Sequence, residues 1–261
     1  MRVRWRRLVP TFLLVATAPV GLVACGTQQA AATPQTANHA VKQQAKSGAA
    51  PKSLTPTAQL ALAAHTLQVE PMHVSYEMTD SLGNVDVRAT AAADPLNRES
   101  ESTTRMTMSG FTRTNSITVV SSAIAIGHHV WGESTPPGGG WHESTRRPQP
   151  PLPLSQLLPY IINVHAIAGK AVRGHSTKGI SFTLNKQGVR LMETMASGVQ
   201  VSPSQQVITS MVFNVWIGTA GHHIRALHLT EHCVSGGHPY QVFETETYYE
   251  WGRALHLSKP A

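Results

Sequence analysis

Histidines are the first candidate groups for chemistry in this chain of 261 residues, which holds 14 of them. Five crowd into one stretch near the C-terminal end: His222, His223, His228, His232 and His238. Zinc requires three or four ligands that converge within about 2.0–2.3 Å of the ion. His228 and His232 share one face of an expected strand but stand about 13 Å apart, which is too far for one ion. We therefore expect solvated or strand-paired histidines and no metal site.

The carboxylates and hydroxyls form no catalytic pattern. Glu244, Glu246 and Glu250 share one face of an expected strand, which we interpret as a solvent-facing surface and not as an acid/base pair. The sequence contains no G-x-S-x-G, no H-E-x-x-H and no phosphate-binding glycine loop. Cys233 follows His232, and we expect it to be a buried structural thiol. The sequence thus predicts no catalytic residue, no cofactor and no enzymatic activity.

The other cysteine, Cys25, follows a segment typical of protein export. The chain begins MRVRWRR, with four arginines and no acid, and an uncharged run from Leu8 to Ala24 follows. A basic start followed by an apolar run is the layout of a secretory signal. Pro10, Pro19 and Gly21 interrupt the run, so it is a poor permanent transmembrane helix.

The four residues Leu22-Val23-Ala24-Cys25 resemble a lipobox, the processing site of bacterial lipoproteins. In that class the cysteine thiol receives a diacylglyceryl group from a phospholipid, and cleavage leaves the cysteine as the N-terminus. The alternative is an ordinary signal-peptidase cut after Ala16-Thr17-Ala18, where Pro19 would be a poor following residue. We expect residues 1–24 to be a lipoprotein signal peptide. Cys25 then anchors the protein in the cell membrane, on its extracytoplasmic face.

Charge argues against a nucleic-acid partner. Removing residues 1–24 removes four arginines and no acid, which lowers the formal net charge from +7 to about +3. Outside the signal the only adjacent basic pair is Arg146-Arg147. A nucleic-acid-binding domain instead carries a basic patch or stripe, so we expect no nucleic-acid partner.

The mature chain divides into a tether and one domain. Residues 26–56 contain one Val, one Leu and no aromatic residue, too little apolar surface to offset the entropy of ordering. We expect the lipidated Cys25 and a disordered tether over residues 25–56, and a folded domain over residues 57–261. Apolar residues at helical spacing predict a first helix from Thr57 to Leu67.

From His73 the apolar period changes to two, which predicts a meander of antiparallel strands. The segment LSQLLPYIINV, residues 154–164, carries Leu and Ile at helical spacing and predicts an amphipathic helix that Pro159 kinks or splits. A short helix is also expected in NKQGVRLMETMASG, and the Thr135–Ser144 segment is expected to be a loop. The count is about ten strands.

The order of these parts resembles the LolA/LolB-like fold, and within it the LppX/LprG-type bacterial lipoproteins. The resemblance covers residues 57–260. It rests on the lipobox and tether, the first helix followed by HVSYEM, the IGHHVW strand before GGGW, the Leu-rich segment, and the order VWIG, HHIRALHL and YYEWGRALHLSKP. The last motif departs from the family pattern, because Arg253-Ala254-Leu255 replaces the usual Pro-Val step.

The resemblance implies an α+β domain, a strongly curved antiparallel sheet or half-barrel whose concave apolar face is covered by helices. Members of the family bind acyl chains there, so a lipid or glycolipid ligand is implied. The candidate cavity residues are apolar positions of strands and of the covering helix: Met106, Met108, Ile124, Ile126, Leu157, Leu158, Ile161, Ile162, Met211, Phe213, Val215 and Ile217. Methionine adapts to irregular apolar partners. The alternative is a filled core in a lipid-anchored structural or signalling domain that binds a protein partner in the cell envelope.

Overall fold

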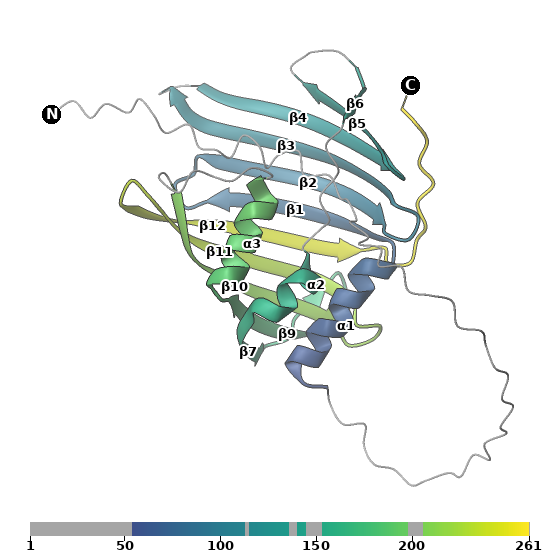
Figure 1. Cartoon of the computed structure of the whole chain (residues 1–261), viewed down its shortest axis with the longest axis vertical. Helices are drawn as coiled ribbons and strands as arrows, with labels where there is room; N and C mark the ends of the chain where they lie inside the picture. The colour runs from purple at the N-terminus through teal and green to yellow at the C-terminus, as the bar shows by residue number, and fades with distance from the viewer. Residues whose placement is uncertain (1–53, 113–114, 136–139, 145–152, 198–205, 261) are drawn as a thin grey trace, which may run out of the picture.

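The fold is an open antiparallel sheet with helices packed on one side, seen in a computed structural model that describes residues 54–112, 115–135, 140–144, 153–197 and 206–260 (Figure 1). The helices are α1 (Pro56–Val69), α2 (Leu154–Leu157), the 3-10 turn η2 (Leu158–Tyr160) and α3 (Lys186–Ser197). The strands of the first half are β1 (Met72–Asp80), β2 (Val85–Asp94), β3 (Glu99–Thr112), β4 (Asn115–Ile126), β5 (His129–Thr135) and β6 (His142–Ser144). The strands of the second half are β7 (Ile161–Ile167), β8 (Ala171–Val172), β9 (His175–Leu184), β10 (Gln206–Gly218), β11 (Ile224–Ser235) and β12 (His238–Tyr249).

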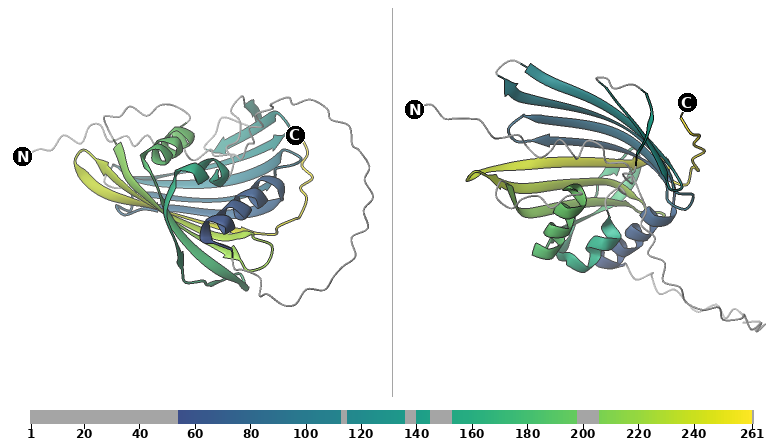
Figure 2. Two further views of the ribbon diagram at one scale, coloured as in Figure 1. Left: turned by 60° about the horizontal axis from the view of Figure 1, so that its bottom comes forward. Right: turned by 45° about the horizontal axis from the view of Figure 1, so that its top comes forward.

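The strands follow the order β6-β5-β4-β3-β2-β1-β12-β11-β10-β9-β7, with β8 paired to β9. All of these pairings are antiparallel, and β1 joins the two halves by pairing with β12. Within the described residues the end strands β6 and β7 do not pair, so the sheet stays open. Figure 2 shows that it curves strongly around the helices. The predicted α+β half-barrel is therefore confirmed, with twelve strands where about ten were expected.

Helix α1 forms where the sequence predicts it. Thr55 is its N-cap, and the Thr55 hydroxyl accepts a hydrogen bond from the backbone N–H of Ala58 at 3.3 Å. Pro56 then occupies the first helical turn, where its missing N–H costs no hydrogen bond. The apolar stripe of α1 is buried against the sheet: Leu60, Ala63, Ala64 and Leu67.

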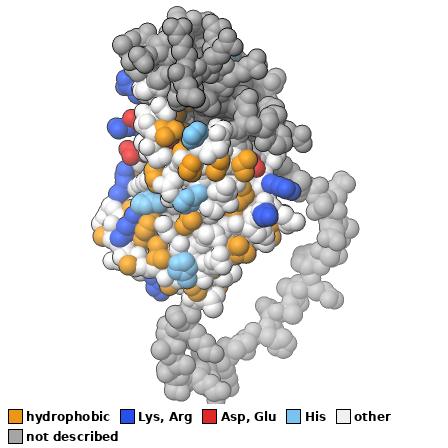
Figure 3. All heavy atoms as spheres, turned by 90° about the vertical axis from the view of Figure 1, so that its left-hand side faces the viewer, with side chains coloured by type: hydrophobic (Ala, Val, Ile, Leu, Met, Phe, Trp, Pro, Cys, Tyr) orange, Lys and Arg blue, Asp and Glu red, His pale blue; other side chains and the backbone are white. Residues whose placement is uncertain are grey.

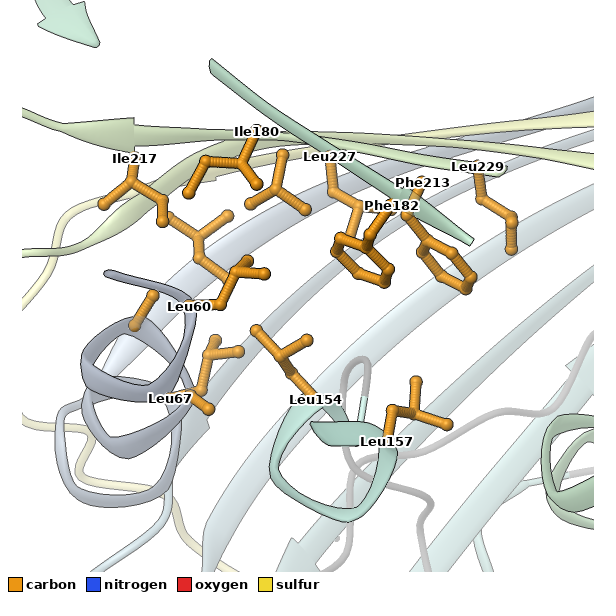
Figure 4. Packing of buried hydrophobic residues seen from close by; sticks show 14 of the residues in the cluster. Leu60, Leu67, Leu154, Leu157, Ile180, Phe182, Phe213, Ile217, Leu227 and Leu229 are labelled. Atoms are coloured by element: carbon orange, nitrogen blue, oxygen red, sulfur yellow. The ribbon is translucent and has the colours of Figure 1, made fainter. Parts of the chain in front are cut away.

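The main core lies between the helices and strands β9–β12 (Figure 4). Leu60 and Leu67 of α1 and Leu154 and Leu157 around α2 point toward the apolar side chains of the sheet. Beneath them Phe182 and Phe213 stack with ring centroids 4.9 Å apart. We call this group the helix-covered cluster; its strand members include Ile180, Phe182, Met211, Phe213, Val215, Ile217, Leu227, Leu229 and Tyr248.

The predicted helix over residues 154–164 is wrong beyond its first turns. Only Leu154–Leu157 is α-helical, the 3-10 turn Leu158–Tyr160 contains Pro159, and the chain then extends into β7. Pro159 cannot donate the backbone hydrogen bond that would continue the helix. Ile161 and Ile162 instead pair with Leu184 and Thr183 of β9. The expected loop of residues 135–144 is also partly wrong, because its end forms the short strand β6.

Candidate functional site on the concave face

The two faces of the sheet differ sharply in burial along β3. Glu101, Thr103 and Arg105 are exposed. Thr104 and Met106, which alternate with them along the strand, are buried. Successive strand residues point to opposite faces, so the even-numbered side chains of β3 face inward. The pairing register extends this assignment across the sheet and defines a concave inner face, on which the helices lie, and a convex outer face.

The helices cover only half of the concave face. Figures 1 and 2 show α1, α2 and α3 over the β9–β12 half, while β2, β3 and β4 carry no described helix. Four inward positions of this open half are small and partly buried: Ala89, Ser102, Ser121 and Ala123. Other inward residues of the same strands, such as Thr104 and Met106, are buried. Small side chains leave more room above a sheet than large ones. The open half is therefore the part of the inner surface that the described helices leave available to another molecule.

A second group of buried apolar side chains lies beside this open half. We call it the methionine cluster; its members are Met78, Val85, Val87, Met106, Met108, Cys233 and Val242. Cys233 is only 1% exposed, which confirms the expected buried thiol. Three of the seven side chains are methionines, which adapt to partners of irregular shape.

The structure separates the predicted cavity residues into four groups. Met106 and Met108 belong to the methionine cluster. Five others are buried within the helix-covered cluster: Leu157, Met211, Phe213, Val215 and Ile217. Leu158 and Ile161 pack against the rim of that cluster, and Ile162 is 43% exposed. Ile124 and Ile126 lie on the convex face, because they pair with Glu101 and Glu99 and not with the inward residues of β3.

Three glutamates lie on the concave face between the two apolar clusters. We call Glu231, Glu244 and Glu246 the acidic strip. Glu244 pairs with Met78 and Leu229, and Glu246 pairs with Tyr76 and Leu227. The interpretation of Glu244 and Glu246 as a solvent-facing strand surface is therefore wrong. Only Glu250, after the end of β12, is exposed as expected.

Two members of the acidic strip have tyrosine partners. Tyr248 donates a hydrogen bond from its hydroxyl to the carboxylate of Glu246. Tyr76 is likewise hydrogen-bonded to Glu244. Burial raises the pKa of Glu244 and of Glu246, and in each case the tyrosine hydrogen bond opposes part of that rise.

Glu231 has no such partner. Glu231 is only 9% exposed. Within the described residues, its side chain forms no hydrogen bond or ion pair. Burial, followed by the charge of Glu193 on α3, raises the pKa of Glu231 from 4.5 to about 7. Burial opposes the ionisation of a carboxyl group, and Glu231 is the acid of this face that the described side chains leave without a hydrogen-bond partner.

Sequence reasoning missed Glu231, although its signal is readable. In LHLTEHC, Leu227, Leu229 and Cys233 occupy alternate positions, and Glu231 falls in step with them. Glu244 and Glu246 likewise fall in step with Val242 and Tyr248. An acidic residue that alternates in step with the apolar residues of a strand indicates a polar group on the buried face of the sheet.

The histidines are dispersed across the sheet. Nε2 of His228 lies 3.3 Å from the Lys170 ammonium on the convex face, where Lys170 also covers the Trp216 ring. Nε2 of His223 lies 2.8 Å from a carboxylate oxygen of Glu70. Across the part of the chain that the structure describes, no group of three or more His, Cys, Asp or Glu side chains could hold a metal ion.

Comparison with known proteins agrees with this architecture. The structure of LprF from Mycobacterium bovis matches with a TM-score of 0.51 at 12% sequence identity, over 79% of this chain and 97% of that one. The structure of the Mycobacterium tuberculosis lipoprotein LppX matches with a TM-score of 0.46 at 14% identity, over 78% of this chain and 98% of that one. The sequence-based resemblance is thus confirmed at the level of the fold, through LprF. No family model matches the sequence, and no curated protein matches it significantly.

Among the described residues, no helix is long and apolar enough to cross a bilayer. Cys25, the predicted lipid anchor, and the predicted tether up to residue 53 lie outside the described residues.

Proposed function

We propose that this protein is an exported, lipid-anchored lipoprotein that binds a lipid or another acylated molecule on the concave face of its sheet. The observation that carries the proposal is the open half of that face, where small inward side chains lie next to the methionine cluster and no described helix covers β2–β4. An acyl chain laid there gains about 0.8 kcal/mol for each buried CH₂ without directional contacts.

The shared fold supports the same proposal. The half-barrel of LprF has the architecture that the sequence resemblance associates with acyl-chain binding. The lipobox adds independent support, since Cys25 would hold the domain next to the membrane from which a lipid is taken. Binding requires no catalytic group, so the protein acts as a carrier or a lipid-binding module and not as an enzyme.

A filled core that presents the sheet to a protein partner is the second candidate function. It is favoured by the helix-covered cluster, in which Phe213, Val215 and Leu157 are each 0% exposed. These side chains pack against the protein itself, so under the lipid-binding proposal the ligand lies over β1–β4 and the methionine cluster.

The test is lipid extraction and mass spectrometry of the full chain, purified without detergent. A co-purified lipid in stoichiometric amount is expected, and a lipid-free protein whose thermal stability does not change on adding lipid would favour the partner-binding function. The site is tested by Ala89→Phe, which places a large ring on the concave face next to Thr104 and Tyr76. We expect it to reduce lipid occupancy several-fold.

The matched control is Thr90→Phe, the adjacent exposed residue on the convex face of the same strand. It introduces the same ring into the same strand but outside the proposed site, so lipid occupancy should stay at the wild-type value. Equal occupancy in both variants would contradict binding over β1–β4. The thermal midpoint of each variant shows whether it is folded.

A further inference from the structure

The acidic strip has no cationic partner among the described residues. Its three carboxyl groups come from two adjacent strands, and the described residues provide no Lys, Arg or His that forms an ion pair with any of them. On the face drawn in Figure 3 most of the Lys and Arg side chains lie along the left edge, and a few lie on the right. The chain's described cations thus leave the strip unneutralised.

The spacing of the strip suits a small group. Glu244 and Glu246 are two residues apart on one strand face, about 7 Å. Glu231 lies opposite Val242 and is therefore diagonal to Glu244, a relation that places backbone positions about 7–8 Å apart. Flexible glutamate side chains spaced in this way converge on one small cationic group more readily than on an extended polar surface.

Glu231 supplies the decisive observation. Tyr248 and Tyr76 already satisfy part of the hydrogen-bonding capacity of Glu246 and Glu244. Glu231 is buried on the same face with no partner of its own, and Glu193 on α3 adds a like charge from the opposite side. A ligand ammonium group would remove both costs, because charge-assisted hydrogen bonds to a carboxylate are about twice as strong as neutral ones.

The apolar surroundings define the rest of the ligand. On one side of the strip lie Leu227 and Leu229 of the helix-covered cluster, and on the other lie Met78 and Val87 of the methionine cluster. A group bound at the strip is thus flanked by apolar surface. We propose that the concave face binds an amphiphile whose polar part carries a protonated primary amine, with that ammonium group held by Glu231 and the acidic strip.

This inference rests on the proposed function and narrows its ligand class. The experiment is displacement of the neutral fluorophore N-phenyl-1-naphthylamine from the full chain at pH 8 by decylamine, decanol or decanoate. The three probes share one chain length and differ in the charge of one end. Decylamine is expected to bind about tenfold or more tightly than decanol, a preference equivalent to about 1.4 kcal/mol, and decanoate should bind most weakly.

The matched variants are Glu231→Gln and Glu101→Gln. Both remove one acid, but Glu101 is exposed on the convex face. Glu231→Gln should reduce the preference for decylamine to about threefold or less while decanol binding is retained, and Glu101→Gln should keep the wild-type preference.

The outcomes separate the two proposals. If the fluorophore binds and all three probes displace it equally, or if decanoate is preferred, the amine inference is overturned and lipid binding stands. If the preference for decylamine survives in Glu231→Gln, the ammonium site lies elsewhere and the inference is also overturned. If neither the fluorophore nor any probe binds, the proposed function itself fails.

Discussion

Glu231 on β11 lies directly opposite Met211 on β10, so a carboxyl group occupies a row that its neighbours in the sheet fill with apolar side chains. The next inward residues on the same strand are Leu229 and Cys233, both buried. Burial at this position, followed by the charge of Glu193, raises the pKa of Glu231 to about 7.

The raised pKa makes the stability of the fold depend on pH. The folded protein holds the Glu231 proton more tightly than the unfolded chain does, because its pKa rises from 4.5 to about 7 on folding. The resulting stabilisation is fully present below pH 4.5 and is lost as the pH rises to about 7. We expect the free energy of unfolding in urea to fall by up to about 3 kcal/mol across this window, and the raised pKa values of Glu244 and Glu246 act in the same direction.

The Glu231→Gln variant isolates this contribution. Glutamine resembles the protonated acid, so the variant should match the wild-type protein at pH 4 and exceed its stability by about 1–3 kcal/mol at pH 8. Glu101→Gln, on the exposed convex face, should change stability by less than about 0.5 kcal/mol at both values. A wild-type protein that gains stability between pH 5 and pH 8 would contradict the burial of an unpartnered acid at this position.

The first helix could be predicted from the sequence, and so could the sets of strand residues that share one face, because both depend on local periodicity. The stripe Leu60, Ala63, Ala64 and Leu67 has helical spacing, and all four residues are buried. Met106 and Met108 likewise share the inward face of β3, as the period of two requires. Periodicity does not state which parity faces inward on each strand, and this explains why Ile124 and Ile126 were assigned to the same face as Met106.

The structure of residues 154–164 and the position of the acidic strip could not be predicted, because both are decided by pairing with strands that are distant in the sequence. Leu154, Leu157, Leu158, Ile161 and Ile162 fit a helix, but the edge of β9 pairs with Ile161 and Ile162 and extends the chain into β7 instead. Tertiary pairing overrode the helical pattern after Pro159. The acidic strip was missed because glutamates are normally exposed, and only the register with β1 and β11 places Glu244 and Glu246 inside.

Packing of α1 against the sheet is tested by two leucines of the same helix. Leu60 is 0% exposed in the helix-covered cluster, whereas Leu62 is 39% exposed. Alanine and leucine have similar helix propensities, so burial is the main difference between the two substitutions. Leu60→Ala should lower the free energy of unfolding by about 2–5 kcal/mol, and Leu62→Ala by less than about 1 kcal/mol. Equal losses, measured by urea denaturation at pH 5, would show that α1 does not dock through Leu60.

The predicted anchor is tested by exchanging the two cysteines separately. In a bacterium that processes lipoproteins, the wild-type chain should partition into the detergent phase of Triton X-114, and its mature N-terminal peptide should carry the mass of a diacylglyceryl group on Cys25. Cys25→Ser removes the thiol that forms this bond, so the diacylglyceryl mass should be absent, and residues 1–24 should remain on the chain because cleavage follows lipidation. Cys233→Ser is the control, because Cys233 is 1% exposed within the methionine cluster and cannot carry an anchor there. A diacylglyceryl mass that persists in Cys25→Ser, or cleavage at the same place without the cysteine, would contradict Cys25 as the lipidated residue.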